Sequence, residues 1–185
     1  SFTQAFAFWD EAEVSRHKKI IEDGLRSFEK VYGYTSTSFT PPAQQLHPEL
    51  YAVLEQLGVE SIDKPRISNR HLGFNKFVKE RNKLGFQKDQ DHLTLVRNVV
   101  FEPTDDRNIE WVDFTFKQIE AAFRTHKPAI VSSHRVNFCG HIDPKNRAKG
   151  LNALNALLHK VVQKYPEVEF MSADQLVEEI HASSK

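Results

Sequence analysis

Cysteine is almost absent from the sequence, since Cys139 is the only one among 185 residues. A single cysteine excludes an internal disulfide, and folds without disulfides form in reducing and oxidising compartments alike, so the compartment stays undecided. The sequence also lacks a run of the roughly 18 apolar residues that cross a bilayer. Its first residues are not the basic and then apolar start of a signal peptide. We therefore expect a soluble protein with no membrane partner.

An excess of charge of either sign is absent as well. Lys and Arg together number 25, as do Asp and Glu, which gives a formal net charge of zero. Non-specific binding to nucleic acid depends on a cationic excess, so the composition argues against a nucleic-acid partner. Hydrophobic residues account for 39% of the sequence and aromatic residues for 11%, which is typical of a globular chain.

Several short motifs of common active sites are missing. The sequence contains no Cys-x-x-Cys, His-Glu-x-x-His, Gly-x-Gly-x-x-Gly, Gly-x-Ser-x-Gly or Walker loop. Cys139 stands close to His141, but this pair beside Gly140 does not have the signature of a catalytic nucleophile.

What the sequence does contain is an alternation of helical and strand-like segments. Helical spacing of apolar residues predicts helices over residues 10–32, 47–57, 109–126, 144–165 and 173–181. Short apolar or β-prone runs predict strands over residues 34–39, 59–63, 93–101, 128–133 and 168–171. Residues 64–91 have weak periodicity, which we interpret as a long loop or an excursion with small strands.

This alternation predicts the fold class. Strands separated by helices indicate parallel pairing with right-handed crossovers. We count four strand–helix units, whereas an eight-unit barrel needs about 250 residues. No linker rich in Pro, Gly or Ser marks a second domain. The prediction is an α/β fold in which residues 1–185 form a single domain that is part of a (β/α) barrel.

One histidine is the best candidate for a catalytic residue. Chemistry in parallel α/β folds gathers where the strands end, and His134 directly follows the predicted strand 128–133. Histidine titrates near neutral pH and can protonate a leaving group there as a general acid. The alternative is a structural histidine bonded to a backbone carbonyl, and the spacing alone does not decide between the two.

Polar residues near other strand ends extend this candidate site. Arg135 and Asn137 donate hydrogen bonds with fixed geometry, so they either bind substrate oxygens or hold the following loop. Glu102 follows a predicted strand and is a candidate carboxylate of the site. Asp105 and Asp106 are interpreted as caps of the next helix.

Three further residues have functional and structural interpretations. Trp9 and Trp111 have rings that can stack on sugars, but Trp111 falls on the apolar stripe of a predicted helix and is expected in the core. His47 precedes a helix and is interpreted as part of its start rather than as a ligand.

Several segments together resemble one known family. The most specific is residues 128–143, which contain the run Ser-His-Arg-Val-Asn-Phe, and it is followed by Asn146-Arg147 and by residues 168–172. Residues 33–50, with Phe-Thr-Pro-Pro-Ala, and the strand end from Arg97-Asn98 to residues 101–103 add to it. The chain resembles the C-terminal part of the polysaccharide deacetylase (NodB-homology) superfamily, in its bacterial glycoside hydrolase/deacetylase branch.

This resemblance implies a distorted (β/α) barrel that removes N- or O-acetyl groups from a carbohydrate by metal-assisted hydrolysis. In the family a divalent metal, often zinc, polarises the acetyl carbonyl, an aspartate acts as base, and a late histidine protonates the leaving group. His134 matches that histidine, and Thr40 and Pro42 lie in the motif that lines one side of the substrate groove. Together with Arg135, Asn137 and Glu102, they are the expected substrate-binding residues.

Two departures from the family pattern limit what this chain is expected to do. Thr40 stands where the family has an arginine that tunes the catalytic base. The family's paired aspartates and its two histidine ligands have no match before the Pro41-Pro42 turn. We therefore expect no metal ligand in this chain, an inactive chain when isolated, and a missing N-terminal part of the same polypeptide as a partner besides the carbohydrate.

Two other classes of function remain open at this point. A glycoside hydrolase needs two carboxylates about 5–9.5 Å apart, which Glu102 and a residue of the absent segment would supply. A non-catalytic carbohydrate-binding protein with a degenerate site would account for the loss at Thr40.

Overall fold

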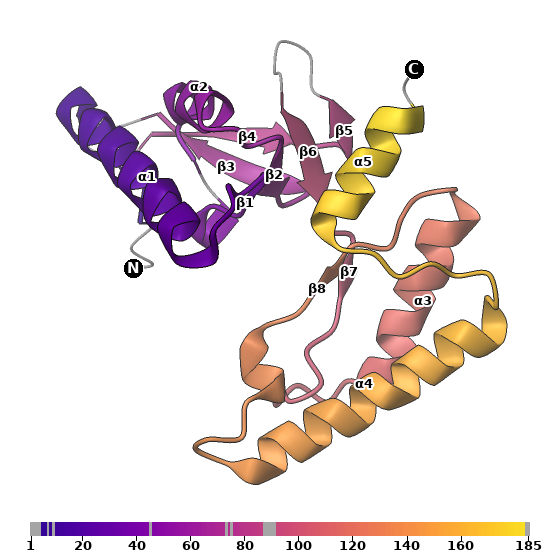
Figure 1. The fold of residues 1–185 in the computed structure, drawn as a ribbon. Coiled ribbons are helices and arrows are strands. Elements are labelled where there is room, and N and C mark those ends of the chain that lie inside the picture. Colours follow the sequence, from indigo (N-terminus) through magenta and orange to yellow (C-terminus); the bar gives the residue numbers. More distant parts are fainter. Residues whose placement is uncertain are drawn as a thin grey trace. The chain divides into compact units, whose positions relative to one another are not determined.

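The computed structural model describes residues 5–6, 8, 10–44, 46–72, 74, 76–86 and 92–183, except for the side chains of His71 and Phe86 (Figure 1). The chain is mixed α/β with small, mainly parallel sheets, and the described residues form no closed barrel. It divides into two compact units, one made of Ser1–Val96 and Met171–Lys185, the other of Arg97–Phe170. We call them unit 1 and unit 2. None of the described helices has the length and apolarity to cross a bilayer.

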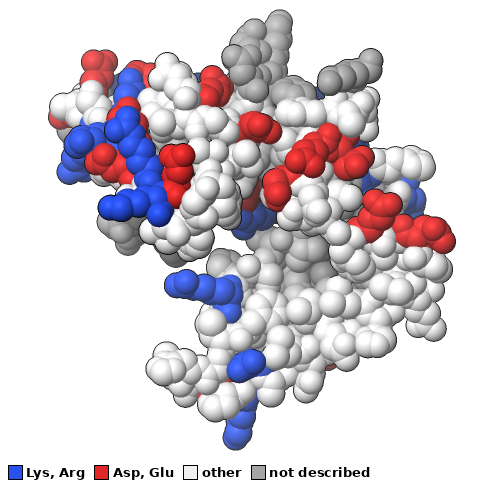
Figure 2. Space-filling view, in the orientation of Figure 1, with Lys and Arg blue, Asp and Glu red and all other residues white. Residues whose placement is uncertain are grey.

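The first helix of unit 1 confirms the prediction from its periodicity. Helix α1 spans Glu11–Tyr32, and the side chain of Asp10 caps it by accepting hydrogen bonds from the backbone of Ala12 and Glu13. Gly33 ends the helix with a left-handed φ of 78°, which glycine adopts without steric cost. On its outer surface basic and acidic side chains mix, as the upper left of Figure 2 shows.

The sheet of unit 1 has the strand order β1-β2-β6-β5. Strands β1 (Ser38–Phe39), β2 (Ser61–Lys64) and β6 (Leu93–Val96) are parallel, and β5 (Gly85–Phe86) is antiparallel to β6. Strands β2 and β6 are fully buried. The 3-10 helices η1 (Pro42–Gln44) and η2 (Pro48–Leu50) and helix α2 (Tyr51–Gln56) connect β1 to β2. Apolar residues of α1, η2, α2 and β2 form the core.

Residues 64–86 contain small strands, which agrees with one of the two interpretations of this region from the sequence, an excursion with small strands. Strands β3 (Ile67–His71) and β4 (Phe77–Arg81) form an antiparallel hairpin after β2. The regular alternation of strand and helix is therefore interrupted, because β2 leads into a hairpin rather than a helix. Helix α5 (Ala173–Ser183) returns to unit 1 at the end of the chain and buries Val177.

Unit 2 is a short parallel strand pair covered by two helices. Strands β7 (Val99–Val100) and β8 (Val131–Ser132) pair in parallel, and helix α3 (Trp111–Arg124) packs on α4 (Pro144–Lys164). The 3-10 helix η3 (Arg135–Phe138) follows β8. The core of unit 2 consists of buried residues from both helices and from β7 and the segment after it. Trp111 is one of them, at 6% exposure, which confirms its predicted place in the core. The others are Val99, Phe101, Phe116, Ile119, Leu157 and Val161.

The single strand predicted over residues 93–101 is wrong. The run divides at Arg97 and Asn98 into β6 of unit 1 and β7 of unit 2. The side chain of Asn98 donates to the backbone oxygen of Pro128 at 2.9 Å and accepts from the backbone N–H of Ile130 at 2.8 Å. These bonds fix the start of β7 against the chain before β8, so the apolar run serves two sheets.

The strand predicted over residues 168–171 is also wrong. These residues are all described and have no strand partner. The backbone N–H of Val168 bonds to the oxygen of Tyr165 in a turn at the end of α4, and both side chains pack against the unit 2 core. Val168 is therefore half-buried in a connection rather than in a sheet, whereas Phe170 and Met171 are 62% and 41% exposed.

Candidate active site in unit 2

A cluster of hydrogen-bonded polar residues lies at the ends of β7 and β8. We call it the Glu102 cluster, and it consists of Glu102, Thr104, Ser133, His134 and Asn137. Glu102 follows β7 by two residues, and Ser133 and His134 follow β8 directly. Because the two strands are parallel, their C-terminal ends meet at one edge, which is where the sequence predicts a site.

His134 and Glu102 form the closest pair in this cluster. The Nδ1 atom of His134 lies 2.7 Å from Oε1 of Glu102, and the backbone N–H of His134 also donates to Oε1, at 3.2 Å. The His134 side chain is 78% exposed, whereas Glu102 is 13% exposed. A carboxylate at Nδ1 favours the tautomer with its proton on that nitrogen. The ring is thereby oriented, and Nε2 becomes the nitrogen that an outside group can reach.

Asn137 holds the other side of Glu102. Its Nδ2 donates to Oε2 of Glu102 at 2.7 Å, to the backbone oxygen of His134 at 2.8 Å and to Oγ of Ser133 at 3.3 Å. Its Oδ1 accepts from the backbone N–H and from the hydroxyl of Thr104, at 3.2 and 2.8 Å. Asn137 is 1% exposed. Both oxygens of Glu102 are thus engaged, one by His134 and one by a buried amide.

Helix α4 supports η3, which carries Asn137. Asp143 caps α4 by accepting from the backbone N–H of Lys145 at 2.9 Å, and Pro144 occupies the first turn. In that turn the Nδ2 atom of Asn146 donates to the backbone oxygens of Val136 and Cys139 at the end of η3. The helix and the loop of the candidate site are therefore fastened together.

Asp105 has a different role from the one predicted. Helix α3 begins at Trp111 with Glu110 at the cap position, so neither Asp105 nor Asp106 caps it, and that expectation is wrong. Asp105 instead accepts hydrogen bonds from the backbone N–H and from Nε of Arg107, both at 2.8 Å. The side-chain bond from Arg107 is the main reason that the pKa of Asp105 lies below its ordinary value.

The remaining predicted site residues are not part of this cluster. Arg135 is exposed at the first position of η3, next to His134. Thr40 and Pro42 belong to unit 1, where the hydroxyl of Thr40 donates to Oδ2 of Asp63 at 3.3 Å and Pro42 begins η1. Asp63 was not singled out from the sequence. Its position near the end of β2, parallel to β1, was the available signal.

Two aromatic-ring residues from the sequence analysis have separate outcomes. The Nδ1 atom of His47 accepts from the backbone N–H of Glu49 at 3.3 Å, so His47 caps η2 and its expected role at a helix start is confirmed. Trp9 lies outside the described residues.

The side chains that the structure describes do not make up a metal site. Within the described ranges there is no group of three or more His, Cys, Asp or Glu residues that could hold a metal ion. Glu102 and His134 supply two such side chains and bond to each other. These two side chains alone therefore support no chemical step through a metal.

Comparison of the chain with models of protein families, with curated proteins and with solved structures finds no match in any of the three.

Proposed function

We propose that this chain is part of a carbohydrate deacetylase with a distorted (β/α) barrel, and that His134 is its general acid. The observation that supports this proposal is the 2.7 Å contact between His134 and Glu102 at adjacent parallel strand ends. In hydrolysis, water adds to the acetyl carbonyl and the bond to the sugar nitrogen or oxygen breaks. Nε2 of a protonated His134 gives its proton to that leaving atom, and acetate is released.

Glu102 acts in this proposal as a positioning residue. Its two carboxylate oxygens are bonded to His134 and Asn137, and its side chain is 13% exposed. A carboxylate held in this way orients the imidazole. The same contacts argue against Glu102 as a nucleophile or base of a glycoside hydrolase, because such a carboxylate must reach the sugar. They favour the deacetylase over that alternative.

The family that the chain resembles uses a divalent metal, often zinc. The described residues contain no group of side chains that could bind it. In this proposal its ligands lie outside them, and the isolated chain is inactive.

The test is acetate release by the intact protein from acetylated glycans, with zinc, cobalt or manganese present. His134→Ala should lower turnover by about 10²–10⁴-fold, the usual contribution of a general acid. His159→Ala is the matched control, since His159 is an exposed histidine of the same unit, on α4. It should leave turnover unchanged.

Two outcomes would contradict the proposal. One is that the intact protein releases no acetate from any glycan tested with any of the three metals. The other is that His134→Ala and His159→Ala are equally active. Glycan binding without acetate release, unchanged in His134→Ala, would instead identify a carbohydrate-binding protein without catalysis.

A further inference from the structure

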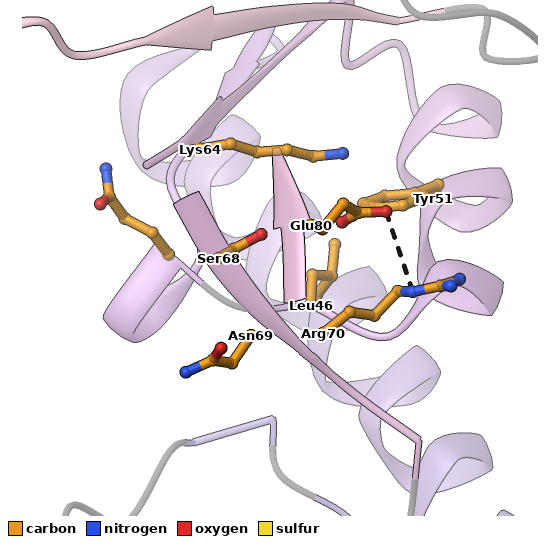
Figure 3. A pocket seen from close by; sticks show the side chains of 8 residues that line it. Leu46, Tyr51, Lys64, Ser68, Asn69, Arg70 and Glu80 are labelled. Atoms are coloured by element: carbon orange, nitrogen blue, oxygen red, sulfur yellow. Dashed lines mark ion pairs between the residues drawn. The ribbon is translucent and has the colours of Figure 1, made fainter. Parts of the chain in front are cut away.

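Unit 1 contains a small pocket that has no residue in common with the Glu102 cluster. We call it the Lys64 pocket; its polar lining comes from Gln44, Tyr51, Lys64, Ser68, Asn69, Arg70 and Glu80 (Figure 3). These residues belong to η1, α2, β2 and the β3–β4 hairpin. The enclosed volume of the pocket is only about 10 Å³, room for about one water molecule, and the rest of it opens to solvent. It can therefore take in only the end of a ligand, such as a single small polar group.

One of the lining residues is a buried lysine. Lys64 is 6% exposed, and its Nζ lies 4.4 Å from the centre of the Tyr51 ring, towards which it extends in Figure 3. Desolvation lowers the pKa of Lys64 from its ordinary value. The charge of Glu80 and the face of the Tyr51 ring offset part of this cost, because both attract the ammonium group. A further anion beside Lys64 would offset the rest.

Two further donors in the same lining lack an acceptor. Nε of Arg70 and Nε2 of Gln44 are buried, and neither has a hydrogen-bond partner among the described residues. Nε of Arg70 lies 3.8 Å from Oε1 of Glu80, which is an ion pair but too long for a hydrogen bond. Buried donors are nearly always paired in folded proteins. Two unpaired donors around one pocket need acceptors from a bound water or from a ligand.

The other polar groups add to this excess of donors. Oγ of Ser68 accepts from Nδ2 of Asn82 at 3.0 Å, which leaves the hydroxyl hydrogen of Ser68 to donate. Burial, and secondarily Glu80, raises the pKa of Tyr51 to about 12, so this side chain is a neutral phenol at physiological pH.

The charges of the lining select among anions. Lys64 and Arg70 are cationic and Glu80 is anionic, which leaves a single positive charge. A monoanion neutralises this charge, whereas a phosphate dianion would leave an excess of negative charge beside Glu80. We propose that the Lys64 pocket binds the carboxylate group of a small ligand, with Lys64, Arg70 and Gln44 as its donors.

The probe for this proposal is acetate, the smallest stable carboxylate with a methyl group. Backbone ¹H–¹⁵N spectra of the whole chain are recorded during titration with sodium acetate, and with sodium chloride at equal ionic strength. Acetate should give saturable shifts at Gln44, Tyr51, Ser68 and Arg70, with a Kd on the order of 1–10 mM for so small a ligand. Chloride should not reproduce them.

Variants then assign the response to the pocket. Lys64→Met keeps the length of a buried side chain and removes its charge, and it should weaken acetate binding at least about 10-fold, the value of one charged hydrogen bond. Lys79→Met is the matched control, because Lys79 is an exposed lysine of the adjacent strand β4. Arg70→Gln should also weaken acetate binding. If Lys64→Met does not fold, Arg70→Gln is the variant that tests whether acetate binds in the pocket.

Three results would overturn the proposal. The first is that acetate and chloride give the same linear, non-saturating shifts. The second is that Lys64→Met and Arg70→Gln both bind acetate as tightly as the control Lys79→Met does. In a third titration, inorganic phosphate at pH 7.5 could bind more tightly than acetate, which would assign the pocket to phosphate groups rather than carboxylates.

Discussion

Gly150 of α4 lies so close to the backbone of Asn137 in η3 that no residue larger than glycine fits at position 150. A Cβ atom on Gly150 would be 1.8 Å from the backbone oxygen of Asn137 and 2.8 Å from its carbonyl carbon. Real Cβ atoms do not approach backbone atoms to these distances. The glycine therefore permits the approach of α4 to the segment that carries Asn137, although glycine is unfavourable inside helices by about 1 kcal/mol.

Gly150→Ala should therefore destabilise unit 2, because α4 and η3 must separate to admit the methyl group. We expect a loss of about 1–3 kcal/mol in the free energy of unfolding, the usual cost of overpacking. Urea unfolding monitored by circular dichroism measures it. Gly24→Ala in α1 is the control, since a Cβ there meets nothing within 4 Å. That variant should gain up to about 1 kcal/mol from helix propensity, and equal behaviour of the two would contradict the packing.

Asn137→Ala should be among the most destabilising polar substitutions in unit 2. It removes the partners of the Thr104 N–H and hydroxyl and of one Glu102 oxygen, all at a residue that is 1% exposed. Unpaired buried polar groups cost about 1–3 kcal/mol each, so we expect a loss of about 2–4 kcal/mol after relaxation. Asn152→Ala, at an exposed position of α4, should change stability by less than about 0.5 kcal/mol. A loss of similar size in both variants would show that the buried network contributes little.

Acid should destabilise unit 1 through His17. Burial lowers the pKa of this histidine from 6.5, with Arg16 adding to the effect and Glu13 opposing it. The unfolded state therefore binds the proton more readily than the folded state. The stabilising contribution is fully present above pH 6.5 and is lost as the pH falls through the lower pKa of the folded state.

Comparison with His17→Leu isolates this contribution. Between pH 7 and pH 5 the unfolding free energy of the wild-type chain should fall more steeply than that of His17→Leu. His159→Leu, which replaces an exposed histidine, should follow the wild type. Parallel curves for the wild type and His17→Leu would refute the prediction.

Alkali should destabilise unit 1 through Tyr51, because the pKa of this residue is shifted upwards in the folded state, whereas that of His17 is shifted downwards. The pKa of Tyr51 is raised to about 12 from 10, so the folded state keeps the phenol proton after the unfolded state has lost it. This contribution is complete below pH 10 and disappears as the pH rises towards 12. In urea unfolding between pH 9 and 11, Tyr51→Phe should lose less stability than the wild type above pH 10. Tyr34→Phe, a change at an exposed ring, should lose as much as the wild type; if Tyr51→Phe did the same, the burial of the phenol would be irrelevant.

The sequence predicts best those elements that local interactions fix. Helix α1 has an aspartate cap, a helical stripe and a terminal glycine, and all three lie within the segment itself. The positions of Glu102 and His134 at neighbouring strand ends also follow from the order of strands and helices, because parallel pairing brings such ends together.

Features that depend on distant partners were not predictable in this way. The division of residues 93–101 requires the bonds from Asn98 to Pro128 and Ile130, some 30 residues further along the chain. The Lys64 pocket likewise combines residues of five elements, η1, α2, β2, β3 and β4, whose spacing in the sequence has no period. An apolar run indicates burial, but it does not say which sheet, or whether a sheet at all, provides it, as Val168 shows.

The division of the chain into units also sets an order of events during synthesis on the ribosome. Unit 2 is one continuous stretch, Arg97–Phe170, whereas unit 1 requires residues from both ends of the sequence. All of unit 2 is translated before α5, and domains generally fold as units while the chain grows. Unit 1 is thus completed after unit 2, although most of it is translated earlier, since Val177 can be buried only when α5 is present.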